Sequence, residues 1–202
     1  MLTETQEQIL AFLVSNPEEQ LTIRGIAKRL GKSYTLVYNN LADLEKKGII
    51  RKQNIPPAQI VILNEFAPAE LFVGIELRRK KGLLEKYLWI EVMLQDILSS
   101  SKNLFFILLV FGSYAKGTQT TKSDLDLLFV VQDKKDIKET ENIMQGVYTK
   151  VKKGINFVDV NDFIEMIKNP NKLNIGNEAK KYHIILYGVE AYYQLLKRLY
   201  KK

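Results

Sequence analysis

The chain has 202 residues, a formal net charge of +7 and no cysteine. This length allows one medium domain or two small ones, and 46% hydrophobic with 26% charged residues is typical of a soluble globular protein. Without cysteine, disulfides and cysteine-based metal or nucleophile chemistry are excluded. No basic segment precedes an apolar run at the N-terminus, and the longest apolar stretch is far too short to span a bilayer. We therefore expect a cytoplasmic protein with no membrane partner, and its positive charge favours anionic partners.

The first sixty residues have the pattern of three helices followed by a hairpin. Apolar side chains recur at helical spacing over residues 3–15, 23–30 and 33–47. Gly31 separates the second and third of these helices, and two short apolar runs flank Pro56 and Pro57. Two helices joined by a short turn form a helix-turn-helix. With the hairpin, this segment resembles a winged helix of the kind found in prokaryotic transcription regulators.

In such a winged helix, the helix over residues 33–47 would read duplex DNA. Residues 24–52 contain eight basic and two acidic side chains, and polar side chains early in a recognition helix can reach base edges and phosphates. The uncharged turn at residues 54–57 leaves open the alternative that this unit contacts another protein, and a homodimer also stays open. The residues expected to contact DNA are Lys32, Ser33, Tyr34, Thr35, Asn39, Arg51 and Lys52.

A third segment, residues 67–101, has helical periodicity and separates this unit from the rest of the chain. Gly82 is the position where it would divide into two helices. We therefore expect a winged helix over residues 1–66, a helical connector over 67–101 and a second domain over 102–202.

The most informative motif lies at the start of that second domain. A nearly all-apolar run at residues 104–110 predicts a buried strand, and Gly112 and Ser113 follow it. Glycine lets the backbone approach a ligand, and a helix beginning at Ser113 would offer free N–H groups to phosphate. Asp124 and Asp126 lie two residues apart in a second apolar run, so they share a strand face. Paired carboxylates attract a divalent cation, and the combination indicates phosphoryl or nucleotidyl transfer.

Gly112-Ser113, followed after ten residues by Asp124-Leu125-Asp126, resembles the signature of the polymerase-beta-like nucleotidyltransferases, in particular their small prokaryotic members. The resemblance implies an α/β (α+β) fold whose mixed sheet is flanked by helices. It also implies that Gly112 and Ser113 hold the triphosphate of a nucleoside triphosphate, while Asp124 and Asp126 bind two Mg²⁺ ions. Lys116, one turn further on, would add a cation to the same phosphates or would be an exposed helix lysine.

The third carboxylate of that family would come from a later strand, for which residues 155–160 are the candidate. The matching position holds Asn156, which can offer a carbonyl oxygen to a cation but cannot act as a general base. Asp159 lies three residues later and on the opposite strand face, where we expect it to end the strand beside a helix N-terminus. Either Asn156 occupies the third position, or Asp159 serves through a shifted register.

Two functions follow from these observations. The first is a Mg²⁺-dependent nucleotidyltransferase that transfers a nucleotide to an acceptor the sequence does not identify, with a winged-helix domain that binds nucleic acid. The alternative is a DNA-binding transcriptional regulator whose transferase domain is a weakly active or inactive nucleotide sensor, which Asn156 favours. His183 is the sole histidine, and we expect it to be structural because one histidine cannot form a triad or a zinc site alone.

Overall fold

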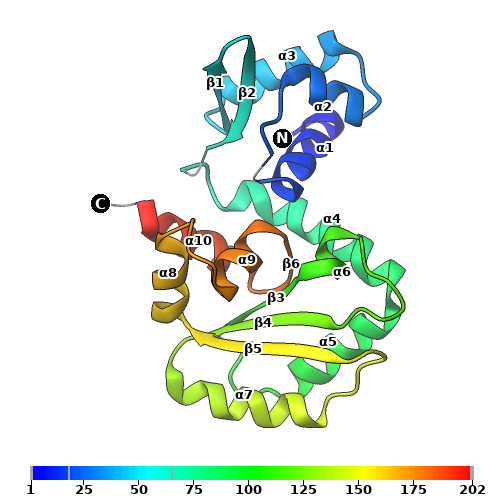
Figure 1. The fold of residues 1–202 in the computed structure, drawn as a ribbon, viewed down its shortest axis with the longest axis vertical. Helices are drawn as coiled ribbons and strands as arrows, with labels where there is room; N and C mark the ends of the chain where they lie inside the picture. Colours follow the sequence, from blue (N-terminus) through cyan, green and yellow to red (C-terminus); the bar gives the residue numbers. More distant parts are fainter. Residues whose placement is uncertain (1, 18, 65, 201–202) are drawn as a thin grey trace. The chain divides into compact units, whose positions relative to one another are not determined.

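The computed structural model describes residues 2–17, 19–64 and 66–200. The chain divides into two compact units, Met1–Ile75 and Glu76–Lys202, which are described separately below (Figure 1). Within the described residues, no helix has the length and apolarity needed to cross a membrane.

The first unit is a winged helix. Its elements are α1 (Glu4–Ser15), α2 (Ile23–Arg29), α3 (Tyr34–Lys46), β1 (Ile50–Ile55), β2 (Ala58–Leu63) and the start of α4 (Glu70–Lys86). Each of the first three helices begins after a hydroxyl side chain that accepts a hydrogen bond from its first turn: Thr3, Thr22 and Ser33. Gly31 and Gly48 have positive φ angles of 61° and 68°, so both helix ends use a backbone conformation that glycine adopts without strain.

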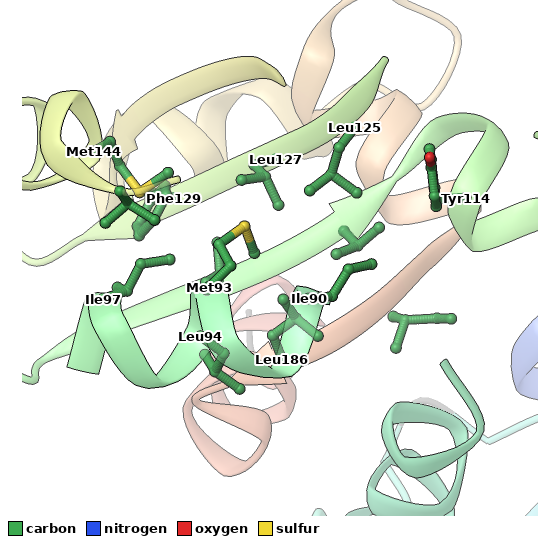
Figure 2. Close-up of a cluster of buried hydrophobic side chains, with 14 of the residues drawn as sticks. Ile90, Met93, Leu94, Ile97, Tyr114, Leu125, Leu127, Phe129, Met144 and Leu186 are labelled. Atoms are coloured by element: carbon green, nitrogen blue, oxygen red, sulfur yellow. The ribbon is translucent and has the colours of Figure 1, made fainter. Parts of the chain in front are cut away.

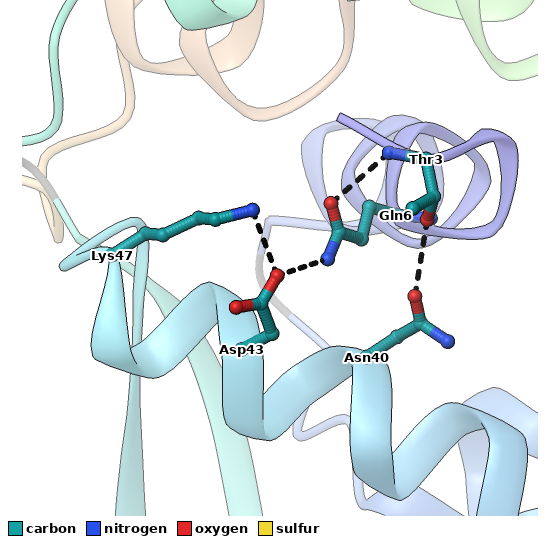
Figure 3. A network of polar contacts seen from close by, with 5 residues as sticks. All are labelled: Thr3, Gln6, Asn40, Asp43 and Lys47. Atoms are coloured by element: carbon teal, nitrogen blue, oxygen red, sulfur yellow. Dashed lines mark hydrogen bonds and ion pairs between the residues drawn. The ribbon is translucent and has the colours of Figure 1, made fainter. Parts of the chain in front are cut away.

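Helix α3 is held by apolar and polar contacts. Val37, Leu41 and Leu44 have no exposed surface. On the side that faces α1, the Gln6 amide donates a 2.6 Å hydrogen bond to Asp43, which also forms a 2.7 Å ion pair with Lys47 (Figure 3). These hydrogen bonds lower the pKa of Asp43, the bond from Lys47 having the larger effect. The orientation of α3 within the unit is therefore fixed from two sides.

The second unit is a four-stranded mixed sheet of order β5-β4-β3-β6. Strand β3 is antiparallel to β4 and to β6, and β4 is parallel to β5. After the rest of α4, its elements are α5 (Leu88–Ser100), β3 (Phe106–Phe111), α6 (Gly112–Lys116), β4 (Leu125–Val131), α7 (Lys134–Gly146), β5 (Lys153–Asp159), α8 (Val160–Lys168), α9 (Ile175–Lys181), β6 (His183–Tyr187) and α10 (Val189–Tyr200).

Helices cover both faces of this sheet. On one face, α5 packs Ile90, Met93 and Ile97 against Leu127 and Phe129 of β4 (Figure 2). On the other face, the cluster is formed by alternate strand residues together with side chains of α8, α9 and α10. Because both faces are buried, β3 and β4 are almost wholly apolar, and a charged residue within them stands out. The predicted α/β (α+β) fold with a mixed sheet is confirmed.

Two details differ from the sequence-based expectation. Strand β3 begins at Phe106 rather than near Leu104, which is 46% exposed. Gly82 lies inside α4, and the break between α4 and α5 falls at Tyr87 instead. A single glycine weakens a helix by only about 1 kcal/mol, which the packing of neighbouring Leu83 in the core offsets.

Candidate functional site

The carboxylate of Asp126 lies directly against the backbone of Gly112. Phe111, the last residue of β3, pairs with Asp126 of β4, so the chain leaves β3 beside this carboxylate. Gly112 has a φ of +65°, and a Cβ atom at this position would overlap the Asp126 carboxylate. Only glycine therefore satisfies both the backbone conformation and the space available. The start of α6 and the acidic strand β4 meet at this point.

The two aspartates project from the same side of the start of β4. Leu125 between them is fully buried on the other side of the sheet, and both aspartates are partly exposed. The pKa of Asp126 is raised, first by burial, then by the negative charge of Glu178 and then by that of Asp124. Asp124 has a partner at 3.6 Å, the ammonium group of Lys152. Asp126 thus carries a negative charge that its surroundings disfavour.

This donor set fits a cation that takes part of its coordination from a substrate. Among the residues that the structure describes, no group of three or more histidine, cysteine, aspartate or glutamate side chains is arranged to hold a metal ion. Mg²⁺ commonly binds through one or two carboxylates together with waters and substrate phosphates. Asp124 and Asp126 supply two carboxylates, and a bound cation would offset the repulsion that raises the pKa of Asp126.

The strand beside Asp126 offers no carboxylate in line with it. Gly154 of β5 pairs with Asp126, and a Cβ atom at residue 154 would lie 3.0 Å from the Asp126 carboxylate. Asn156 is on the same face of β5 as Gly154, but it pairs with Leu128, two residues beyond Asp126. Asp159 is buried at the strand end, and its carboxylate accepts a 2.8 Å hydrogen bond from the Asp162 backbone as the N-cap of α8. The Asp159 carboxylate therefore caps the N-terminus of α8.

The expected phosphate-binding residues lie in and around α6. Ser113 is partly exposed in the first turn of this short helix. Lys116 is exposed, and its ammonium group lies 4.9 Å from the centre of the Tyr182 ring, at the end of α9. This cation–π contact directs Lys116 toward α9. Gly112 therefore lies at the Asp126 carboxylate, whereas Lys116 contacts the residue that follows α9.

Glu178 of α9 is a site residue that sequence reasoning missed. Its charge raises the pKa of Asp126 more than the charge of Asp124 does. Tyr182, which contacts Lys116, follows the last residue of α9 in an extended conformation. No local pattern singles out Glu178, because 52 residues separate it from Asp126 and only the fold brings the two together.

Behind the site, β6 is anchored to α4 and α10 by a buried polar network. Arg79 donates one hydrogen bond to Glu76 at 2.7 Å and another to the His183 carbonyl at 2.6 Å, and Tyr193 donates to Glu76 at 2.7 Å. His183 pairs with Phe111, next to Gly112. The His183 ring is buried and its Nδ1 lies 2.9 Å from the Ala179 carbonyl oxygen. Since that oxygen can only accept, Nδ1 carries the proton. Burial lowers the pKa of His183 to about 4, so its role is structural.

The residues expected at DNA are distributed over α3 and the hairpin. Tyr34, Thr35 and Asn39 are exposed on α3, and Arg51 is exposed on β1. Two others have structural roles. The Ser33 hydroxyl accepts a 3.3 Å hydrogen bond from the Leu36 backbone and caps α3. The Lys52 ammonium group forms a 2.8 Å ion pair with Glu45 and lies over the Tyr38 ring. Lys32, which precedes the N-cap of α3, is partly buried.

Two family models match parts of the chain. Residues 93–180 match the family model described as "Polymerase beta, Nucleotidyltransferase", and residues 2–58 match the model of the MarR family. The expected pairing of a polymerase-beta-like nucleotidyltransferase domain with a winged helix is thus confirmed. No curated protein matches the chain.

Two solved structures are similar over part of the chain. One is MepR, a transcription regulator of the Staphylococcus aureus multidrug efflux pump MepA. The two sequences are 25% identical, the match covers 49% of this chain and 79% of the MepR chain, and the TM-score is 0.36. The other is an alanine-to-valine mutant of MepR from a multidrug resistant S. aureus clinical isolate, with 25% identity, 49% and 78% coverage, and a TM-score of 0.35.

Proposed function

We propose that this chain, which joins a MarR-family winged helix to a polymerase-beta nucleotidyltransferase domain, transfers a nucleotide from a nucleoside triphosphate in a Mg²⁺-dependent reaction and binds duplex DNA through α3. The observation that carries the transferase half is the packing of the Asp126 carboxylate on Gly112. It brings a phosphate-binding turn and paired carboxylates to one point, as nucleotidyl transfer requires.

Each residue of the site has a role that follows from its position. Asp124 and Asp126 would hold Mg²⁺, which when bound neutralises phosphate charge and favours displacement at phosphorus. The backbone N–H groups of the first turn of α6 have no partner within the helix and can donate to a phosphate oxygen, and the hydroxyl of Ser113 can donate to the same oxygen. Lys116 would add a positive charge for the phosphates if it left the face of Tyr182, which its ammonium group contacts. Transfer then depends on positioning and charge.

The test of this half is Mg²⁺-dependent nucleotide binding, measured by calorimetry with a non-hydrolysable ATP analogue. Replacing Asp124 and Asp126 by Asn keeps the side-chain shape and removes the charges that attract the cation, so affinity should fall tenfold or more. A control variant with Asp133→Asn and Asp136→Asn removes the same charge elsewhere in the domain and should bind normally. Equal affinities for all three proteins would disprove the metal site.

A second function, a nucleotide sensor without turnover, is favoured by one observation. The residue in line with Asp126 on β5 is Gly154, and Asn156 is the next residue on that face, so neither of these two positions offers a general base. An enzyme should transfer label from an α-labelled nucleotide to an acceptor in cell extract. A sensor should bind the same nucleotide, transfer nothing and change its DNA affinity when nucleotide is present.

The DNA-binding half rests on the exposed side of α3 and the basic residues around it. Phosphate contacts make such binding salt-dependent. Replacing Lys32 and Arg51 by Ala should weaken binding to every duplex and lower the salt slope by about 2, one unit for each lost contact. The control is Lys135→Ala with Lys138→Ala, two exposed lysines of the other unit. A gel-shift titration of the full chain at two salt concentrations tests this, and failure to bind DNA at low salt would disprove it.

A further inference from the structure

The outermost stripe of α3 is formed by Thr35, Asn39 and Ala42. These residues are spaced three and four apart, so they lie on one line along the helix. They lie opposite the fully buried line that contains Val37 and Leu41. Thr35 and Asn39 are exposed and Ala42 is partly exposed. We call these three residues the reading stripe, because they lie on the side of α3 opposite its buried line.

The Asn39 amide is available for a ligand, unlike that of its neighbour. Asn40 donates a 2.8 Å hydrogen bond to the Leu36 carbonyl and accepts one from Thr3, so its amide is used within the fold. Within the described part of the chain, the Asn39 amide has no such partner. Thr35 and Ala42, the residues above and below it, each present a methyl group. The reading stripe therefore offers one amide between two methyl groups.

No cation is available on the first two turns of α3. Residues 33–42 contain no charged side chain, and the flank toward the hairpin is formed by Tyr34 and Tyr38, whose rings stack 6.0 Å apart. Lys46 lies about 10 Å along the helix from Asn39. The nearby Lys52 is already paired with Glu45. A recognition helix contacts bases mainly through its N-terminal residues, so the usual guanine reader, a bidentate arginine or lysine, is missing there.

We propose that the reading stripe selects A·T base pairs in the major groove. The Asn39 amide would accept from adenine N6 and donate to N7, which is the amide pairing that fits adenine. The methyl groups of Thr35 and Ala42 would pack on the C5-methyl groups of neighbouring thymines. This inference rests on the proposed DNA binding and adds to it the sequence class that is bound.

The first experiment selects duplexes from a pool of random 24-base-pair DNA with the full chain at low salt and sequences those retained. Enrichment of A·T pairs in the retained duplexes is the expected result. Duplexes retained without a base preference, or enriched in G·C pairs, would overturn the inference while leaving DNA binding intact. Retention of no duplex would overturn both the inference and the proposed DNA binding.

The second experiment changes single groups on each side of the contact. Deoxyuridine in place of thymine removes only the methyl groups and should weaken binding about fourfold for each methyl contact, the effect of exposing one buried carbon. Asn39→Ala should weaken binding to the selected duplex tenfold or more, and by a larger factor than it weakens binding to random duplex.

Asn39→Arg is a gain-of-function variant for the same position. It should move the preference there from A·T to G·C, since arginine pairs with guanine. Arg24→Ala, on α2, is the matched control, because loss of a phosphate contact weakens all duplexes equally and leaves the preference unchanged. If Asn39→Ala and Arg24→Ala lower affinity for selected and random duplexes alike, Asn39 does not read bases.

Discussion

The space that a side chain at residue 112 would need is occupied by the carboxylate of Asp126. The two residues are separated by fourteen positions in the sequence, and the pairing of β3 with β4 brings them together. A change at Gly112 therefore acts on Asp126 as well as on the local backbone.

Gly112→Ala should abolish Mg²⁺-dependent nucleotide binding because the new methyl group displaces the Asp126 carboxylate. Gly117→Ala is a matched control. Gly117 also has a positive φ, +71°, but no atom lies within 4 Å of the position of its Cβ. Both variants should lose about 1–2 kcal/mol of stability from the backbone strain, measured by denaturant unfolding. Calorimetry should show loss of binding for Gly112→Ala only, and equal binding by both variants would contradict the prediction.

The position of the third metal-binding residue can be tested by exchanging the amide of Asn156 and the acid of Asp159 for each other. If Asn156 occupies that position, Asn156→Asp should supply a base and a cation ligand and raise any transfer activity. Asp159→Asn should change activity little, and because Asn is also a good N-cap, it should keep α8 intact. Asp159→Ala should cost about 1 kcal/mol through loss of the cap. Loss of transfer in Asp159→Asn, with unchanged stability, would show that Asp159 is the working acid.

Glu178→Gln should lower the pKa of Asp126, because one of the negative charges that raise it is removed. The Asp126 carboxylate would then stay ionised to lower pH, so Mg²⁺ binding should persist to lower pH than in the wild type. A carbon-detected NMR titration of the Asp126 carboxyl group measures the pKa directly. Glu190→Gln, another exposed glutamate of the same unit, is the control and should leave the titration unchanged.

His183 should make the protein sensitive to mild acid. Its pKa is about 4 in the folded protein and 6.5 for an ordinary histidine, so the unfolded chain binds the proton more readily. The neutral ring contributes its full amount to the free energy of unfolding above pH 6.5, and this contribution is lost as the pH falls toward 4. Between pH 7 and pH 4.5 this loss is about 2 kcal/mol. His183→Phe should be less stable at pH 7 but should lose about 2 kcal/mol less over this interval in urea unfolding. An unchanged pH dependence would show that His183 titrates normally.

The sequence predicted those parts of the molecule whose signals are local. The helical spacing of apolar residues over 23–30 and 33–47, with Gly31 between them, marked α2, α3 and the turn that joins them. Gly112-Ser113 and the two aspartates marked one side of the candidate site in the same way. A strand end and the turn after it depend on residues that are close together in the sequence, so a short motif can reveal them.

The rest depends on contacts between distant segments. Glu178 reaches Asp126 only through the packing of α9, and Tyr193 meets Glu76 across 117 positions. The residue facing Asp126 on β5 depends on the register of a parallel pair, which apolar periodicity does not fix because every residue of a doubly covered strand can be apolar. The pairing of Gly154 with Asp126, and of Asn156 with Leu128, was therefore beyond the reach of the sequence.

Helix α4 runs without interruption across the division between the two units, which falls between Ile75 and Glu76. Buried side chains on both sides of that point, Phe72, Ile75, Glu76 and Leu83, follow one another at spacings that keep them on one face. Phe72 and Ile75 belong to the first unit and Glu76 and Leu83 to the second, so α4 supplies buried side chains to both. A fragment that ends inside α4 would therefore lose core side chains of one unit, and either unit should be produced separately only with the whole helix attached.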